Sequence, residues 1–242
     1  MKIEIWSDYA CPFCYIGKRR LEQALKKFPH RAQVEVNFKS FELDPNAPHD
    51  ISQSIHEILA SKYGMSVEEA KRTNEGMRQQ AAEVGLTFNF DTLIPTNTFD
   101  AHRLTHFAKS NNKEAELTEK LLRAYFTESR HLGDREVLAD IAQEAGLDRE
   151  EVLKFLADET TLADEVRSDE QMAQQMGVRG VPFFVINQKY GISGAQPTET
   201  FLSALEKVWQ EEQSGPVIQD LSGDNSQGGA CADGSCDLPE QK

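Results

Sequence analysis

The chain has 242 residues, of which 39% are hydrophobic and 27% charged, and it carries a formal net charge of −14 at pH 7. This composition is typical of a soluble globular protein with one large domain or two small ones. The negative charge disfavours binding to nucleic acid and to anionic membrane surfaces, so we expect neither as a partner. No apolar run is long enough to cross a bilayer, and the opening residues MKIEIWSDYA lack the apolar core of a signal peptide, so we expect a cytoplasmic protein.

The first elements predict a strand–helix–strand unit. Residues 2–6 read as a short strand, residues 12–28 as a helix that begins at Pro12 and ends before Pro29, and residues 33–43 as a second strand with alternating apolar residues. The connection between the two strands is long enough for them to lie parallel in one sheet.

A long helical region follows, and strand character returns near the end of the chain. We expect helices at 51–63, 67–84, 100–110, 114–127, 134–144, 149–157 and 160–176, a hairpin of strands at 181–187 and 189–194, and a last helix from Pro197. This order predicts an α/β protein with one discontinuous domain (1–43 and 160–213), an all-helical insertion (44–159) and a flexible acidic tail (214–242).

Cys11 and Cys14 lie where the first strand gives way to the first helix. The free N–H groups and partial positive charge of a helix start favour a thiolate at Cys11, and Cys14 lies one turn deeper on the same face. One cysteine would attack a disulfide and the other would resolve the product. Half of a zinc site, or two ordinary buried cysteines, are the alternatives, and the strand–CPFC–helix context favours redox chemistry.

The motifs DYACPFCYIG, FELDPNAP and GVRGVPFFVI, in this order, resemble the DsbA family of the thioredoxin superfamily, in particular its FrnE-like subgroup. That subgroup is related to the 2-hydroxychromene-2-carboxylate isomerases and the kappa-class glutathione transferases. The resemblance implies a thioredoxin-like fold with a large helical insertion, Cys11 as the nucleophile and Cys14 as the resolving cysteine. It also implies a cis peptide bond before Pro182, in a loop against the cysteines where the backbone of Val181 pairs with an extended substrate.

The dipeptide between the cysteines, Pro12-Phe13, departs from strongly oxidising members of the family, which often have histidine at the second position. Phenylalanine cannot donate a hydrogen bond to a thiolate, so we expect a less oxidising pair. The sequence leaves the direction of electron flow open.

Cys231 and Cys236 form a second pair in GGACADGSCDL, near the end of the chain. A flexible tail from residue 214 spans about 23 Å, comparable with the radius of the fold, so this pair is within reach of Cys11. We favour a relay of electrons between the two pairs over incidental thiols, and both over one zinc site built from all four cysteines. His102 and His106 have the i, i+4 spacing of metal ligands, but no third ligand is evident, and we interpret them as part of a helix with mixed faces.

The sequence therefore predicts a thiol–disulfide oxidoreductase that acts on disulfides of proteins or small thiols. We expect no bound cofactor and no metal, since the cysteines carry the electrons. Glutathione is a candidate co-substrate. We expect a monomer or a homodimer. One alternative is a glutathione-dependent isomerase or transferase of the 2-hydroxychromene-2-carboxylate isomerase or kappa type, although those relatives generally have serine in place of the first cysteine. A second alternative is a zinc-binding redox sensor or chaperone.

Overall fold

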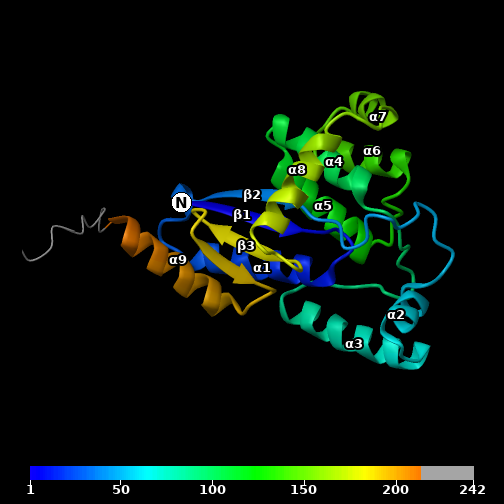
Figure 1. Cartoon of the computed structure of the whole chain (residues 1–242), viewed down its shortest axis with the longest axis horizontal. Coiled ribbons are helices and arrows are strands. Elements are labelled where there is room, and N and C mark those ends of the chain that lie inside the picture. The colour runs from blue at the N-terminus through cyan, green and yellow to red at the C-terminus, as the bar shows by residue number, and fades with distance from the viewer. Residues whose placement is uncertain (214–242) are drawn as a thin grey trace, which may run out of the picture.

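The computed structural model describes residues 1–213, which form a four-stranded mixed sheet, helices against its faces and a larger group of helices beside it (Figure 1). No helix within these residues is both long and apolar enough to cross a membrane. The elements in chain order are β1 (Lys2–Ser7), α1 (Pro12–Lys27), a 3₁₀ turn (Arg31–Gln33), β2 (Glu35–Ser40), α2 (Ile55–Tyr63), α3 (Val67–Glu83), α4 (Phe99–Ser110), α5 (Glu114–Phe126), α6 (Arg135–Glu144), α7 (Arg149–Ala157), α8 (Ala163–Gln175), β3 (Phe183–Ile186), β4 (Tyr190–Ser193) and α9 (Thr198–Gln213).

The sheet has the strand order β2-β1-β3-β4. β1 and β2 are parallel, with Ile3 opposite Val36, whereas β3 runs antiparallel to both β1 and β4. Asn187 and Gln188 connect β3 to β4 with φ angles of 51° and 55°, the left-handed conformation that a tight hairpin turn requires. Both the parallel first unit and the late hairpin expected from the sequence are therefore confirmed.

Alternation along β1 sends its side chains into two different cores. Ile3 and Ile5 pack with Leu21 of α1 and Phe201 of α9 on one face, where these two helices contact each other. Trp6 points to the opposite face, where it meets Ala173 of α8. The sheet is thus covered on both sides, and the end of β1 is held firmly in place.

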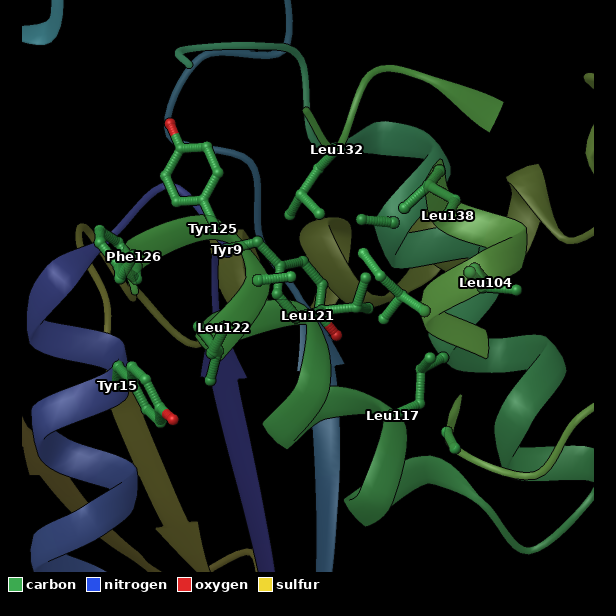
Figure 2. Packing of buried hydrophobic residues seen from close by; sticks show 14 of the residues in the cluster. Tyr9, Tyr15, Leu104, Leu117, Leu121, Leu122, Tyr125, Phe126, Leu132 and Leu138 are labelled. Atoms are coloured by element: carbon green, nitrogen blue, oxygen red, sulfur yellow. The ribbon is translucent and has the colours of Figure 1, made fainter. Parts of the chain in front are cut away.

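A third apolar core fills the helical block and reaches α1 (Figure 2). Tyr15 and Ile16 of α1 belong to this core, together with Leu121 and Phe126 of α5 and Leu104 of α4. The first turns of α1 are therefore packed between the sheet and the helical block. The division of the chain into domains at residues 43/44 and 159/160 stays a prediction.

Several predicted boundaries are wrong by a few residues. β2 ends at Ser40 rather than at residue 43, because the N–H groups of Ser40, Glu42 and Leu43 bind the carboxylates of Asp169, Glu170 and Asp8 instead of another strand. The helix expected from residue 51 begins at Ile55, after a capping box made by Ser54 and Glu57. The helix expected from residue 160 begins at Ala163.

Candidate functional site

The two cysteines of the CPFC motif occupy the start of α1. Cys11 is the N-cap residue, with an extended backbone (φ −98°, ψ 111°), and Pro12 is the first helical residue. The N–H of Cys14 donates to the carbonyl of Cys11 at 3.0 Å, which closes the first turn. Both cysteines are free thiols and both are buried, whereas the ring of Phe13 between them is 40% exposed. Phe13 is therefore the exposed residue of this turn, whereas the two cysteines are almost covered.

The Val181–Pro182 loop faces Cys11. The peptide bond before Pro182 is cis, as the resemblance implied. The Cys11 thiol donates to the carbonyl oxygen of Val181, with 3.5 Å between sulfur and oxygen. The Pro182 ring lies so close to α1 that a Cβ atom added to Gly17 would be 3.0 Å from its Cγ. The structure thus brings Cys11, Val181 and Pro182 together, and the helix carries Cys14 beside them.

Cys14 lies deeper than Cys11 and is fully enclosed. The N–H of Asp8 donates to its sulfur at 3.5 Å. Burial and the neighbouring Cys11 hold the pKa of the Cys14 thiol well above its usual value, although hydrogen bonds from the Ser7 side chain and the Asp8 N–H act in the opposite direction. Cys14 is therefore a protonated thiol at neutral pH and has to lose that proton before it can attack a disulfide.

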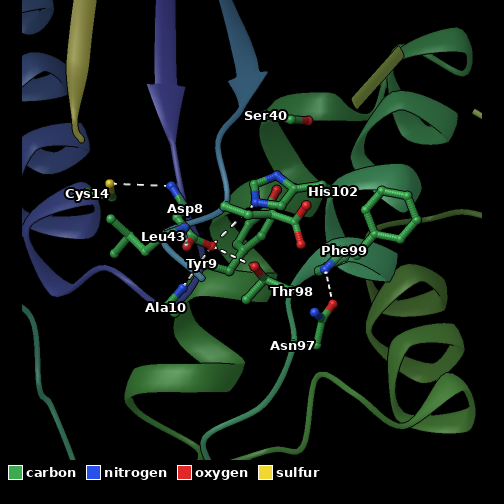
Figure 3. Close-up of polar contacts among 12 residues, drawn as sticks. Asp8, Tyr9, Ala10, Cys14, Ser40, Leu43, Asn97, Thr98, Phe99 and His102 are labelled. Atoms are coloured by element: carbon green, nitrogen blue, oxygen red, sulfur yellow. Dashed lines mark hydrogen bonds and ion pairs between the residues drawn. The ribbon is translucent and has the colours of Figure 1, made fainter. Parts of the chain in front are cut away.

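The carboxylate of Asp8 is the hub of a buried polar network (Figure 3). Its Oδ1 accepts from the Thr98 hydroxyl at 2.8 Å and lies 3.4 Å from Nε2 of His102, and its Oδ2 accepts from the N–H of Leu43 at 2.7 Å. Burial opposes ionisation, but the bond and the charge of His102 and the hydrogen bonds from Leu43 and Thr98 outweigh it, so the pKa of Asp8 lies below its ordinary value.

Asp8 ties three segments together at the base of the cysteine pair. It belongs to the link between β1 and α1, Leu43 follows β2, and Thr98 caps α4. The same two outer segments are also joined to each other, since the N–H of Asn97 donates to the carbonyl of Pro48 at 3.1 Å. The ionised side chain of Asp8 therefore helps to position the CPFC turn relative to the helical block, together with the apolar core that Tyr15 and Ile16 share with it.

The sequence did not indicate the network that Asp8 organises, because its members come from distant parts of the chain. The i, i+4 spacing of His102 and His106 was a usable signal, but each imidazole meets its own carboxylate. His102 bonds Asp8, and Nε2 of His106 lies 3.2 Å from both Ser40 Oγ and Asp169 Oδ2. Within residues 1–213, no group of three or more histidine, cysteine, aspartate and glutamate side chains is arranged to hold a metal ion.

The second cysteine pair, Cys231 and Cys236, lies outside the described residues. The relay and the four-cysteine zinc site, which both involve this pair, therefore stay predictions.

Comparison with known proteins gives a consistent result. The model of the DSBA-like thioredoxin domain matches residues 2–206. An uncharacterized protein of Bacillus subtilis, YwbO, is 30% identical over 204 residues, which cover 84% of this chain and 94% of that protein. A crystal structure of a probable DsbA oxidoreductase from Streptomyces coelicolor is 44% identical, with a TM-score of 0.85, and the match covers 99% of this chain and 100% of that one.

The fold also resembles that of a 2-hydroxychromene-2-carboxylate isomerase, with a TM-score of 0.65 at 14% identity, over 90% of this chain and 100% of the isomerase. At this identity the likeness concerns the fold alone. The family model spans most of the chain, and the cysteine pair, the cis-proline loop and the helical insertion are all in place. The chain therefore belongs to the DSBA-like thioredoxin domain family.

Proposed function

We propose that the chain is a thiol–disulfide oxidoreductase in which Cys11 is the nucleophile and Cys14 the resolving cysteine. The observation that carries the proposal is the placement of Cys11 at the N-cap of α1, facing the Val181 carbonyl, with Cys14 one turn behind it. This arrangement puts the reactive sulfur at a helix start and the second sulfur within reach of the same bond.

In the reducing direction, the thiolate of Cys11 attacks a substrate disulfide, forms a mixed disulfide and releases one substrate thiolate. The Cys14 sulfur then attacks the sulfur of Cys11, so the Cys11–Cys14 bond forms and the bond between Cys11 and the substrate breaks. Two electrons pass from the cysteine pair to the substrate sulfurs, and the same steps run backwards in the oxidising direction.

The loop at Val181 and Pro182 supports an extended substrate. Val181 presents a carbonyl group beside Cys11, and a peptide chain that carries a cysteine can align its own backbone with such a group. We therefore propose disulfides of proteins or small thiols as substrates, in the cytoplasm, with no bound cofactor. The 44% identity to the probable DsbA oxidoreductase over nearly the whole chain supports this class of activity.

Trapping at Cys11 tests the proposal. In Cys14→Ser the resolving thiol is gone, so the mixed disulfide should accumulate. The variant is expressed in cells, thiols are quenched with acid and alkylated, and whatever is attached to Cys11 is mapped by mass spectrometry. The double variant Cys11→Ser/Cys14→Ser is the matched control and should retain no partner.

The proposal predicts protein or small-molecule disulfide partners on Cys11. Glutathione as the sole adduct would favour the glutathione-dependent isomerase or transferase instead. Stoichiometric zinc in freshly purified protein, with all thiols protected from alkylation, would favour the redox sensor or chaperone. A wholly free Cys11 would contradict disulfide exchange at this pair.

We further propose that Cys231 and Cys236 exchange electrons with the front pair. In Cys14→Ser, a crosslink from Cys11 to either rear cysteine would support this relay. If Cys231→Ser/Cys236→Ser leaves turnover and reduction potential unchanged, the relay is wrong and the rear thiols are incidental.

A further inference from the structure

A small cavity of about 10 Å³ lies beside Ser7, the residue between Trp6 and Asp8 at the end of β1. This volume is about that of one water molecule in a polar site. The cavity is lined by polar and apolar groups alike. Its lining residues are Ser7, Tyr9, Phe38, Lys39, Ser40, His102, Thr105, His106 and Thr118.

Thr118 points to a bound molecule in this cavity. Its hydroxyl is fully buried and, among the described residues, has no partner in hydrogen-bonding geometry, although the Tyr9 hydroxyl is nearby. Tyr9 is already bonded to the Thr105 hydroxyl. Buried hydroxyl groups are nearly always satisfied, and a water molecule in the adjoining cavity would satisfy this one.

Two residues that line the cavity connect it to the resolving cysteine and to a base. Ser7 lines the cavity, and the N–H of the next residue, Asp8, donates to the Cys14 sulfur at 3.5 Å. The imidazole of His102 also lines the cavity, with Nε2 directed at Asp8. Figure 3 shows Ser40, another lining residue, on the side of the His102 ring away from Asp8. With Nε2–H donated to the carboxylate, Nδ1 is the free acceptor of the neutral ring.

We propose that the cavity binds one water molecule, and that this water and the Ser7 hydroxyl carry the proton of Cys14 to His102. The inference rests on the proposed disulfide exchange and identifies the proton acceptor for its resolving step. Cys14 cannot give its proton directly to bulk water, because it is only 2% exposed.

The proton of Cys14 reaches His102 in three transfers. The S–H proton of Cys14 passes to Ser7, the Ser7 hydroxyl proton passes to the water, and a water proton passes to Nδ1 of His102. The Cys14 sulfur attacks Cys11, the bond between Cys11 and the substrate sulfur breaks, and the departing thiolate takes up a proton from solvent. The imidazolium is held against Asp8 until it returns its proton to solvent.

The charges around His102 suit this role. Asp8 pairs with the ring directly, and the Tyr9 ring packs against it at a centroid distance of 5.0 Å. Glu42 follows β2, and its fully buried side chain pairs with Arg167 at 2.5 Å and feels the charge of His102. Asp100 and Arg103 in the first turn of α4 pair with each other. Glu170 pairs with Arg167, and Asp169 pairs with both His106 and Lys39.

Reaction with 5,5′-dithiobis(2-nitrobenzoic acid) separates the two chemical steps. Reduced protein releases one equivalent of chromophore when Cys11 forms the mixed disulfide and a second when Cys14 resolves it. The chromophore leaves as a stable anion, so the pH dependence of the second phase reports deprotonation of Cys14. The full chain with Cys231→Ser/Cys236→Ser serves as the parent, so that the rear thiols do not contribute.

His102→Gln is expected to slow the second phase at pH 7 by about 100-fold, at the low end of general-base effects. It should leave the first phase unchanged. The difference in second-phase rate between variant and parent should disappear as pH rises, because hydroxide then removes the proton of Cys14. His56→Gln is the matched control, because this buried histidine does not line the cavity and its two ring nitrogens are bonded to Asp91 and Asn74, so both of its phases should equal those of the parent. Ser7→Ala should show the same selective loss as His102→Gln, and it provides a second variant if His102→Gln does not fold.

An unchanged second phase in His102→Gln and Ser7→Ala, in a parent that shows two phases, would overturn the relay and leave the oxidoreductase proposal standing. An equal slowing of both phases, or a selective loss in His56→Gln instead, would also overturn it. A parent with no second phase would overturn both proposals.

Discussion

The thiol of Cys11 and the carbonyl oxygen of Val181 lie 3.5 Å apart, although 170 positions separate the two residues in the chain. This contact places the start of α1 against the loop that precedes β3. It depends on close packing between the two segments, because Gly17 of α1 leaves just enough room for the Pro182 ring. The position of Cys11 relative to this loop thus depends in part on the close approach of Gly17 to the Pro182 ring.

Gly17→Ala tests this packing. The new Cβ would lie 3.0 Å from Pro182 Cγ and 3.2 Å from Phe184 Cζ, both on the other side of the contact. Overpacking of this kind costs about 1–3 kcal/mol of unfolding free energy, and the loop should move away from Cys11. Urea unfolding and the rate of disulfide exchange measure the two effects. Gly76→Ala in α3 is the control, since its Cβ meets nothing within 4 Å, and it should gain roughly 0.5–1 kcal/mol from helix propensity.

Asp8→Asn tests the network below the cysteines. The amide keeps one oxygen but loses the charge that Thr98, Leu43 and His102 stabilise, so the unfolding free energy should fall by about 2–3 kcal/mol at pH 7. The pKa of Asp8 is lower in the folded state than in the unfolded chain. The ionised carboxylate therefore stabilises the fold fully above its ordinary pKa of about 4, and this stabilisation is lost as pH falls through the pKa of the folded state. The deficit measured by urea unfolding should therefore narrow below pH 4. A deficit that stays constant down to pH 2 would contradict this role.

Glu119→Gln tests the ion pairs that attach α5 to α1. Glu119 pairs with the buried Lys18 and with Arg19 at 2.6 Å, and despite partial burial these cations and the Tyr15 hydroxyl lower the pKa of Glu119 to about 2. Its contribution is present above pH 4.5, the ordinary value, and is lost as pH falls toward 2. The free energy of unfolding of the variant should be lower by about 1–2 kcal/mol at pH 7, after allowance for solvent screening. Below pH 4.5 it should depend less on pH than that of the parent.

Glu199→Gln is the control for this prediction. Glu199 lies 3.7 Å from Lys27, and both side chains are exposed. Its loss should change the unfolding free energy by less than about 0.5 kcal/mol. Equal changes in the free energy of unfolding from the two substitutions would show that the ion pairs of Glu119 do not stabilise the contact between α5 and α1.

Phe13→His tests what sets the reduction potential. The ring is 40% exposed, so the substitution should be tolerated, and an imidazole N–H would add a hydrogen-bond donor near the Cys11 thiolate. A stabilisation of the thiolate by about 1.4 kcal/mol corresponds to about 30 mV. The reduction potential of the cysteine pair should therefore rise by about 30 mV, which makes the pair more oxidising. Phe13→Leu lacks a donor and should leave the potential unchanged. An unchanged or lower potential in Phe13→His would contradict the prediction.

Much of the fold was predictable from the sequence, because its signals are local. The alternation in residues 2–6, Pro12 at a helix start and the hairpin at Asn187 each report on neighbouring residues. The end of β2 was not predictable, since it depends on carboxylates from Asp8, Asp169 and Glu170, which come from distant parts of the chain.

The candidate site divides in the same way. Cys11 and Cys14 carry a local signal, whereas Pro182 was placed opposite them by resemblance alone. The Asp8–His102 contact joins residues 94 positions apart, and only the packing of α4 against the β1–α1 link creates it. A lone aspartate before CPFC and a histidine pair on a helix each have several ordinary explanations, and no spacing rule connects them.

Equilibration of the purified protein in glutathione buffers of graded potential tests disulfide exchange at Cys11 and Cys14 most directly. Quenched samples are digested, and the peptides that contain the two cysteines are quantified by mass. The proposed function predicts a single two-electron transition in which a Cys11–Cys14 disulfide replaces two free thiols. A stable glutathione adduct on Cys11 with Cys14 still reduced at every potential, or no oxidation of either cysteine, would contradict it.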